Sequence, residues 1–473
     1  MFSRLSHLPR SLRFTQLTNA ILVVGGLASI FVLLNVVYVY GFRAERSFTS
    51  TAGMVWYYTL PLVLTIVCFG ALRLTPTHRQ CVSLVGLAFA ALVYGSEVTL
   101  DVIAHGKGTS GDANQMVAEL RRSGVSAVRS VVTPVVPYDQ VAAGSSDRQA
   151  RTPELIALGG IARRKTVTCQ DAGNWLVYDS DEHGFHNPLG LWKSGQVDIA
   201  AVGNSWTQGW CVPSNRNFVS LIRVRHRATV NLGISGEGPL QILAIAKEYL
   251  SVLQPKIVIW FYFEGNSLRE LQDEKRNELL MRYVHSDFRQ GLLERQDEID
   301  QALGAFAEEQ DGQRENQTRD AGSHAAFATL PDVIKLTSLR NAFGVVYGVD
   351  AQAQSALQDL RGPTIELFHQ IVAAVKSQVS SWGGTLVFVY LPSSERYAAW
   401  TRPTLSPDSQ QRTTVLQLIE ETAIPIIDLQ PVFRDRGGHL LFREGRFNEE
   451  GNRVIAEHVL DGISAIMNRN VTR

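Results

Sequence analysis

Three long apolar runs fill the first quarter of the chain, over roughly residues 20–40, 55–72 and 82–94. The first two are long enough to cross about 30 Å of hydrocarbon as helices, and the third reaches that length when extended to residue 101. The first run has no charge and exceeds the ~7–15 apolar residues of a signal peptide. We therefore expect residues 1–103 to form a membrane domain of three transmembrane helices, with a cleaved leader or buried soluble helices as the alternatives.

The basic residues that flank these runs predict the orientation of the domain. Five arginines lie before the first run or between the second and third, against two between the first and second. They are Arg4, Arg10, Arg13, Arg73 and Arg79 against Arg43 and Arg46. Since basic loops stay in the cytoplasm, we expect a cytoplasmic N-terminus. Three crossings then place everything after about residue 104 on the outer side of the membrane.

The pattern becomes regular from about residue 166, where short apolar runs alternate with helical stretches. The runs are rich in β-branched and aromatic residues and cover residues 197–203, 228–234, 256–263, 385–391 and 424–429. The helical stretches cover residues 238–253, 363–382 and 410–422. Strands that alternate with helices predict an α/β domain over residues 166–473, with a parallel sheet covered on both faces.

Two segments depart from this alternation. Residues 104–165 contain clusters of glycine, serine and aspartate and two prolines within 132–137, so we expect a linker and an irregular lead-in. About residues 268–349 form an insertion with a polar middle at 308–320, which has little apolar surface to bury. This insertion is either a surface feature or a lid over a site at the sheet edge.

Composition narrows the class of function. The net charge is zero, from 45 basic and 45 acidic residues, so the chain has no electrostatic footprint for nucleic acid. The sequence contains no metal-ligand cluster and no phosphate-binding loop, and we expect neither a metal nor a cofactor.

Cysteine usage agrees with an exported domain. Cys68 and Cys81 fall in the predicted membrane helices, which leaves Cys169 and Cys211 as an even pair in the outer part. In an oxidising compartment such a pair predicts a disulfide. Two separate buried thiols are the alternative.

Three predicted strands end in small or amide residues. Ser205 follows the first strand in the run Gly-Asn-Ser-Trp-Thr-Gln-Gly, Gly236 closes Asn-Leu-Gly-Ile-Ser-Gly, and Asn266 closes Phe-Glu-Gly-Asn. The carboxyl ends of parallel strands meet at one edge of a sheet, so these residues are expected to lie together. A serine presented at such a turn is a candidate nucleophile for acyl transfer, which also needs a base and donors for the oxyanion.

In this order, the three blocks resemble those of the SGNH (GDSL-type) hydrolase superfamily. The resemblance covers about residues 166–468 and implies a flavodoxin-like three-layer domain with Ser205 as nucleophile and Gly236 and Asn266 as oxyanion donors. Residues 178–188 look like a segment of membrane-anchored bacterial members that often occur with surface-polysaccharide genes. The implied protein is an ester hydrolase or O-acyltransferase of the inner membrane, with a periplasmic domain that acts on an acylated envelope glycan beside polysaccharide machinery.

The fourth block departs from the family pattern. The family's catalytic His lies two residues before an Asn, and that register here gives Arg446 before Asn448. A guanidinium stays protonated at physiological pH and cannot accept the serine proton. Glu444 occupies the place of the acidic residue that usually orients the His. Asn204 replaces the family's Asp beside Ser205, and the resemblance implies substrate binding by Asn204 and Asn448.

Two hypotheses of function therefore remain open. In the first, the chain is an enzyme whose base is another histidine. The candidates are His439 first, then His458, His183 and His186. In the second, it is a catalytically degenerate module that binds glycan or partner proteins. Arg446 would then bind a carboxylate, phosphate or sulfate group, or form a surface salt bridge with a nearby glutamate.

Overall fold

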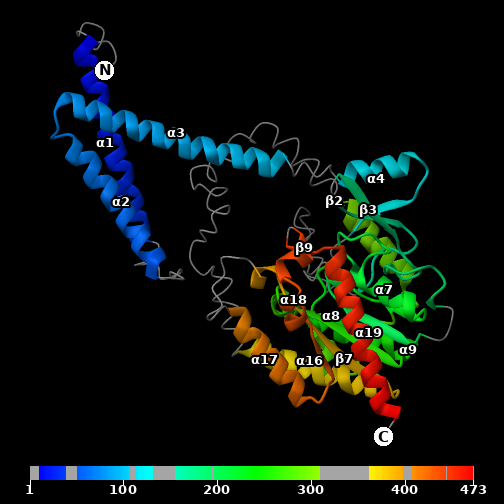
Figure 1. Ribbon diagram of the computed structural model, residues 1–473. Helices are drawn as coiled ribbons and strands as arrows, with labels where there is room; N and C mark the ends of the chain where they lie inside the picture. The colour runs from blue at the N-terminus through cyan, green and yellow to red at the C-terminus, as the bar shows by residue number, and fades with distance from the viewer. Residues whose placement is uncertain are drawn as a thin grey trace. The chain divides into compact units, whose positions relative to one another are not determined.

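The chain forms two compact units, residues 1–109 with 320–355 and residues 110–319 with 356–473. The computed structural model describes residues 10–38, 51–106, 113–130, 155–171, 173–192, 197–308, 362–397, 407–443 and 445–471. Figure 1 traces the elements along the chain. Each unit is described by itself below.

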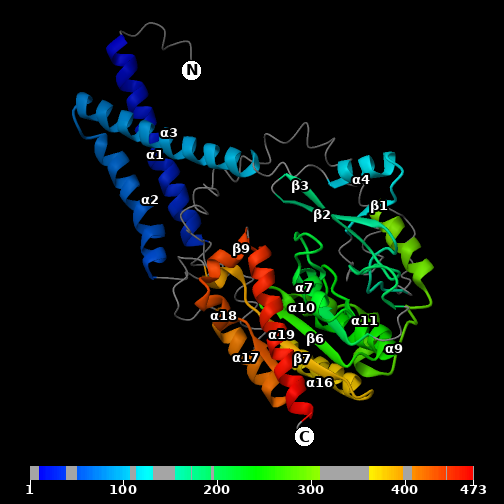
Figure 2. The same cartoon turned by 45° about the vertical axis from the view of Figure 1, so that its right-hand side comes forward.

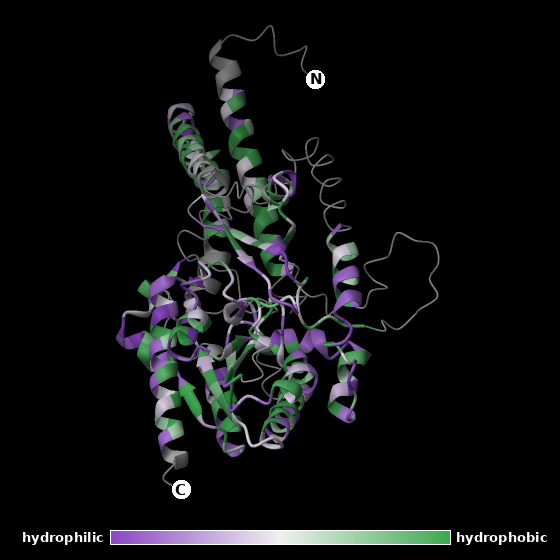
Figure 3. Ribbon diagram, turned by 90° about the vertical axis from the view of Figure 1, so that its right-hand side faces the viewer, coloured by the Kyte–Doolittle hydropathy of each residue, from purple (hydrophilic) through white to green (hydrophobic). Residues whose placement is uncertain are grey.

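Three helices form the described part of the first unit: α1 (Arg10–Val37), α2 (Thr51–Ala71) and α3 (Pro76–Gly106). They pack through close contacts, since a Cβ at Gly26 of α1 would lie 2.6 Å from the Phe69 ring of α2. Arg79 of α3 also donates a hydrogen bond to Asn19 of α1. Apolar residues run along α1, the helix beside the label N in Figure 3.

Among the residues that the structure describes, two helices are long and apolar enough to cross a membrane, where three were predicted. The candidate spans are Thr15–Val37 and Pro76–Leu100, while the apolar part of α2 is the shorter stretch Tyr58–Ala71. A perpendicular span needs about 20 apolar residues, which Tyr58–Ala71 does not supply. By length and composition, α1 and α3 therefore have the properties of spanning helices, and a crossing by α2 stays a prediction.

The second unit is built on a five-stranded parallel sheet. In the spatial order β5-β4-β6-β7-β8, the strands are Thr229–Asn231, Ile199–Gly203, Ile257–Phe263, Thr385–Leu391 and Ile426–Asp428. Numbered along the chain from β4, this order is 2-1-3-4-5, which is that of flavodoxin-like sheets. The five apolar runs are thus confirmed as strands, and the predicted α/β fold with a parallel sheet is confirmed.

Helices cover both faces of this sheet, as Figures 1 and 2 show. Alternate residues of β6 bury on opposite sides: Val258, Trp260 and Tyr262 on one, Ile259 and Phe261 on the other. The first face packs against α8 (Pro239–Ile245), α10 (Ser267–Glu274), α11 (Glu278–His285), α16 (Pro363–Ser380) and α17 (Pro407–Glu421). The second packs against α7 (Phe218–Arg225), α18 (Gln430–Asp435) and α19 (Glu449–Val471).

The predicted helical stretches are also present. The stretch 238–253 is α8 continued by a π-helical turn, Ala246–Leu250, and by α9 (Ser251–Leu253). The stretches 363–382 and 410–422 correspond to α16 and α17. Residues 268–308 of the predicted insertion contain α10 and α11 and a helical segment from residue 296, whereas its polar middle lies outside the described residues.

A second, three-stranded sheet precedes the parallel one. It consists of β1 (Ala127–Arg129), β2 (Lys165–Asp171) and β3 (Asn174–Asp179), with α4 (Ala113–Arg122) packed on it. Its core is small, with Val117, Ala127 and Val167 as the buried residues. The expected linker at residues 104–165 therefore contributes a helix and a strand. Their apolar positions are too few to form a run that the sequence pattern would reveal.

Gly203 ends β4 in a backbone conformation that L-amino acids rarely adopt, with φ of +148°. A Cβ there would lie 2.4 Å from Thr207 Oγ1 and 2.7 Å from the Phe261 carbonyl oxygen. Glycine is thus required both by the backbone angle and by the close approach of β6.

We predict that Gly203→Ala destabilises the second unit by more than the roughly 1–3 kcal/mol of a strained backbone angle alone, because the new methyl group also meets fixed atoms. Gly383→Ala is the control, since Gly383 has φ of +80° but no atom within 4 Å of its Cβ position. Thermal unfolding of the detergent-solubilised chain measures both. Equal losses of melting temperature would contradict the steric part of the argument.

Candidate active site

Ser205 begins α6 (Ser205–Gln208) directly after β4 and its terminal Gly203. Asn204 caps this short helix, and its Oδ1 accepts the Trp206 N–H at 3.2 Å. Ser205 is half-buried, and neither its N–H nor its Oγ has a hydrogen-bond partner among the residues that the structure describes. As the first residue of a helix it has an N–H with no intrahelical acceptor. A hydroxyl and an N–H are thus both presented at the carboxyl edge of the sheet.

Gly236 lies beside this turn, after the neighbouring strand β5. The two turns are joined where the Ile234 N–H donates to the Gly203 carbonyl at 3.2 Å. Ser235 is buried but Gly236 is partly exposed, with φ of +86°. Within the described part of the chain, the Gly236 N–H has no acceptor. Two backbone donors with unused hydrogens at one edge are what an oxyanion site needs.

Asn266 is bound directly to the first block. Asn204 Nδ2 donates to Asn266 Oδ1 at 2.7 Å, and Asn266 Nδ2 donates to Glu270 Oε1 at 2.7 Å. An amide nitrogen carries two hydrogens, so the second N–H of Asn266 remains for a ligand. Asn204 itself is only 2% exposed. It therefore holds Asn266 against the turn that carries Ser205, which is a supporting position for a residue expected to contact substrate.

Glu270 is a neighbour that the sequence did not single out. Burial raises the pKa of this carboxyl group to about 8. It is therefore largely neutral at pH 7 and places little negative charge beside the Asn266 amide. The spacing of four residues from Asn266 to Glu270 along α10 is the signal that could have found it, since side chains at that spacing share a helix face.

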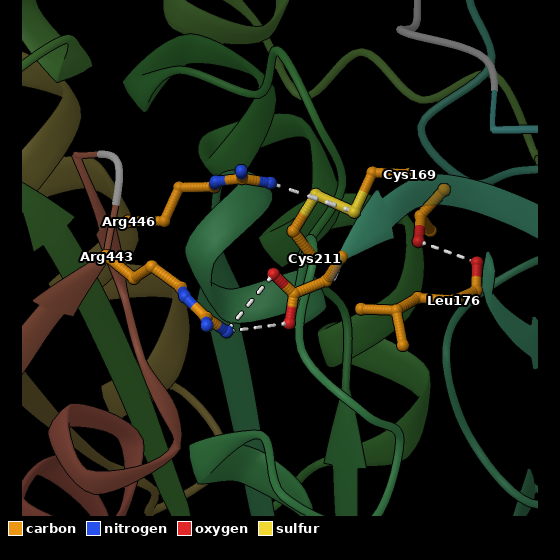
Figure 4. Close-up of a disulfide and its surroundings, with 7 residues drawn as sticks. Cys169, Leu176, Cys211, Arg443 and Arg446 are labelled. Carbon is orange, nitrogen blue, oxygen red and sulfur yellow. Dashed lines mark hydrogen bonds and ion pairs between the residues drawn. A yellow bond between two sulfur atoms is a disulfide. The ribbon is translucent and has the colours of Figure 1, made fainter. Parts of the chain in front are cut away.

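The fourth block is a hairpin of β9 (Phe442–Arg443) and β10 (Arg446–Phe447). Arg446 is half-buried, and its Nη1 lies 3.8 Å from Cys169 Sγ, as Figure 4 shows. Arg443 Nη1 lies 3.3 Å from Asp171 Oδ2. Both arginines of the hairpin are thus directed to β2. Glu444, predicted to orient the residue at position 446, lies outside the described residues.

Asn448 connects this hairpin to α19. Its Oδ1 accepts the Gly451 N–H at 2.8 Å, and its Nδ2 donates to the Leu440 carbonyl at 2.8 Å. The side chain, expected to contact substrate, thus serves as a helix cap.

The histidines of residues 178–188 are held in hydrogen bonds. His186 Nδ1 lies 2.8 Å from the Gln208 carbonyl oxygen and therefore donates, which leaves Nε2 to accept the Ser214 hydroxyl at 3.0 Å. Burial lowers the pKa of His186 to about 4. His183 Nδ1 lies 3.3 Å from Gln296 Oε1, and its ring packs edge-on against Trp192. Neither imidazole is arranged to take a proton from Ser205.

The other two candidate bases lie in the C-terminal part. His458 Nδ1 lies 2.9 Å from the Val454 carbonyl oxygen within α19. His439 is exposed on the 3₁₀ turn Gly438–Leu441. Across the described ranges, no histidine forms a hydrogen bond with Ser205. His439 is thus the candidate whose ring nitrogens form no hydrogen bond to another described residue.

The disulfide predicted from the sequence is present between Cys169 and Cys211. Cys169 lies on β2, and Cys211 lies in the loop that follows α6. The bond therefore ties the three-stranded sheet to the loop that leaves α6, beside Arg446 (Figure 4).

A buried ion pair supports the third block. Glu264, two residues before Asn266, is 1% exposed, and its Oε1 accepts Arg396 Nε at 2.9 Å and the Ser393 N–H at 2.7 Å. Tyr390 donates its hydroxyl to Glu264 Oε2 at 2.7 Å. The loop after β7 is therefore fastened to the turn that carries Asn266. No local sequence pattern predicts this pair, because its members are 132 residues apart.

No family model matches the chain, and no curated protein matches it. Similar solved structures include a protein described as lipolytic, of the G-D-S-L family, from Desulfitobacterium hafniense, with 12% identity and a TM-score of 0.31 over 56% of this chain and 99% of that one. The psychrotrophic esterase EstA from Pseudoalteromonas sp. has 10% identity and a TM-score of 0.30 over 58% and 100%. A GDSL-like lipase from Bacteroides thetaiotaomicron has 11% identity and a TM-score of 0.30 over 58% and 90%. TM-scores and identities this low carry no argument about the site. The site is therefore interpreted from its own geometry.

We predict that replacing both Cys169 and Cys211 by serine lowers the free energy of unfolding by about 3–4 kcal/mol, since the bond closes a loop with a sequence separation of 42. Thermal unfolding of the detergent-solubilised chain measures the loss. Cys81→Ser, which removes a free thiol, is the control. Alkylation of both Cys169 and Cys211 in non-reduced protein, read by mass spectrometry, would contradict the bond.

Proposed function

We propose that this chain is a membrane-anchored SGNH-type ester hydrolase or O-acyltransferase, acting on acyl groups of an envelope or extracellular polysaccharide through Ser205. The observation that carries the proposal is the pair of unused backbone N–H groups of Ser205 and Gly236 beside the Ser205 hydroxyl. Among the described residues, these two N–H groups form no hydrogen bond within their own turns. They can therefore donate to the charged oxygen of a tetrahedral intermediate.

The proposed chemistry follows from these positions. Ser205 Oγ attacks the ester carbonyl, and the oxygen that gains charge is bound by the N–H groups of Ser205 and Gly236 and by the second amide N–H of Asn266. The alcohol leaves and an acyl-serine remains. Water then releases the acid in a hydrolase, or a glycan hydroxyl accepts the acyl group in a transferase. No step needs a metal or cofactor.

The proton of Ser205 needs an acceptor, and Arg446 cannot serve. We propose that His439 takes this role inefficiently, so that the wild-type chain turns over slowly. Loss of the base in a serine triad typically lowers turnover by about 10⁴–10⁶-fold.

A second candidate function is glycan binding without turnover. Two observations favour it: a guanidinium stands at position 446, and Ser205 Oγ has no hydrogen-bond partner among the described side chains. A cation in the fourth block would suit a carboxylate, phosphate or sulfate group on a polysaccharide.

For the membrane unit we propose three crossings, with the N-terminus in the cytoplasm of a Gram-negative cell and the second unit in the periplasm. Two observations support this topology. The helices α1 and α3 have the length and composition of spans, and the Cys169–Cys211 bond suits an oxidising compartment. The helix α2 would then cross between them with the residues that precede Tyr58. Envelope-polysaccharide machinery is the partner that this location implies.

We predict that a fluorophosphonate probe labels the wild-type chain slowly at Ser205 and that Arg446→His raises the labelling rate, because an imidazole can accept the serine proton. Arg446→Lys keeps the cation and is the matched control, and Ser205→Ala should abolish labelling. Mass spectrometry locates the adduct and gives its rate. If neither the wild type nor Arg446→His is labelled, binding without turnover is the function that remains. If His439→Ala abolishes the wild-type rate, His439 is the base.

The topology is tested by a fluorescent reporter that matures only in the cytoplasm. Fused after Arg473 it should stay dark, and fused after Leu74, between α2 and α3, it should fluoresce. The number of crossings decides the outcome, because two spans would return the second unit to the cytoplasm. Fluorescence of the fusion after Arg473 would overturn both the third crossing and the periplasmic location.

A further inference from the structure

Gln208, the last residue of α6, bonds the turn that presents Gly236. The side chain is 2% exposed. Its Oε1 accepts both the Ser235 N–H at 3.1 Å and the Ser235 hydroxyl at 2.6 Å. Ser235 immediately precedes Gly236, so these two bonds hold the N–H and the side chain of the residue before the Gly236 N–H. Since a backbone N–H can only donate, the atom of Gln208 that faces Ser235 must be the amide oxygen.

The other end of Gln208 is held by β3 and the segment that follows it. Gln208 Nε2 donates to the Tyr178 hydroxyl at 3.0 Å. Tyr178 is buried, and its ring stacks on His186 at a centroid distance of 4.1 Å. Burial raises the pKa of Tyr178 to about 12, so the hydroxyl stays protonated. His186 in turn donates to the Gln208 carbonyl at 2.8 Å, which holds the backbone of the same residue.

The beginning of the second block is held by other contacts. Asn231 Nδ2 donates to the Thr207 carbonyl at 2.7 Å. A Cβ at Gly233 would lie 2.6 Å from Thr207 Cβ, so the backbone there packs directly on α6. Further along, Ser235 donates to Gln208 from both its N–H and its hydroxyl, and the Glu237 N–H closes the turn by donating to the Ile234 carbonyl at 3.2 Å. Gln208 is therefore the side chain that holds the residue before Gly236 within this turn.

We propose that Gln208 is a positioning residue that sets the direction of the Gly236 N–H, and that Tyr178 sets Gln208. The segment before the parallel sheet thereby controls how well the site binds an oxyanion. The consequence for chemistry rests on the proposed function. The conformational order of the turn that carries Gly236 does not rest on the proposed function. It can be measured whether or not the chain is catalytically active.

Two variants distinguish the hydrogen bonds that the Gln208 side chain accepts from those that it donates. Gln208→Met keeps the approximate volume and removes every side-chain hydrogen bond, whereas Gln208→Glu keeps an acceptor for both Ser235 bonds. Gln241→Met is the matched control, because Gln241 is 1% exposed and its amide atoms have no hydrogen-bond partner among the described residues. Ser235→Ala removes one of the two bonds, and it is a milder variant if Gln208→Met fails to fold.

The first measurement is hydrogen–deuterium exchange of the full chain in detergent, read on peptides that cover residues 232–240. Gln208→Met should raise the exchange rate of the Ser235 amide about tenfold, as expected for loss of one hydrogen bond. Ser235→Ala should raise it less, and Gln208→Glu and Gln241→Met should leave it within about twofold. Equal exchange in the wild type and Gln208→Met would overturn the proposal, whatever the labelling shows.

The second measurement is the rate of fluorophosphonate labelling at Ser205. Gln208→Met should lower the rate of the covalent step by about 10²-fold with little change in reversible binding of the probe, because an oxyanion donor is lost. Raised exchange with unchanged labelling would overturn the link to the oxyanion. A wild type that is not labelled at all would remove the proposed function, and the exchange result alone would then decide whether Gln208 positions the turn.

Discussion

Buried hydrogen bonds between the turns at the carboxyl edge of the parallel sheet are the constraint on which the second unit depends. Each turn leaves backbone and amide groups in the interior, and an unpaired group there costs about 1–3 kcal/mol. The chain pairs these groups across blocks: Asn204 with Asn266, Asn231 with the Thr207 carbonyl, and Gln208 with Ser235. The groups without partners in the described residues, the N–H of Ser205 and of Gly236, then stand out as candidates for binding a ligand.

Buried carboxylates extend this constraint to the elements around the site. Glu264 binds Arg396 and so fixes the loop after β7 to the third block, while Glu274 accepts the N–H groups of Gly238 and Leu240 at the start of α8. Removing one partner of a buried ion pair leaves an uncompensated charge, which is strongly destabilising. The turn that carries Asn266 is therefore held from β7 as well as from β4, and its amide is fixed before any ligand arrives.

Local sequence patterns were sufficient for the sheet and for the positions of three candidate site residues at its edge. Ser205, Gly236 and Asn266 each follow an apolar run, and a parallel sheet brings such strand ends together without further information. The contacts that the sequence did not reveal act over long separations: Gln208 to Ser235 spans 27 residues, Asn204 to Asn266 spans 62, and Arg396 to Glu264 spans 132. No periodicity encodes such pairs. The short elements α4 and β1 were not predicted for a different reason. Their core consists of only a few residues, so they form no apolar run that the sequence pattern would reveal.

The same reasoning explains how an arginine can stand at position 446, where the sequence resemblance implies a histidine, within an intact fold. The hairpin that carries Arg446 is held by its neighbours: Phe447 packs against Trp206, Asn448 caps α19, and Arg443 pairs with Asp171. Apart from the Arg446 contact with Cys169, these bonds do not involve the side chain at 446. These supports come from Phe447, Asn448 and Arg443. The proposed enzyme and the proposed binding module therefore share the sheet and the turns at its edge, and the residue at position 446 separates the two proposals.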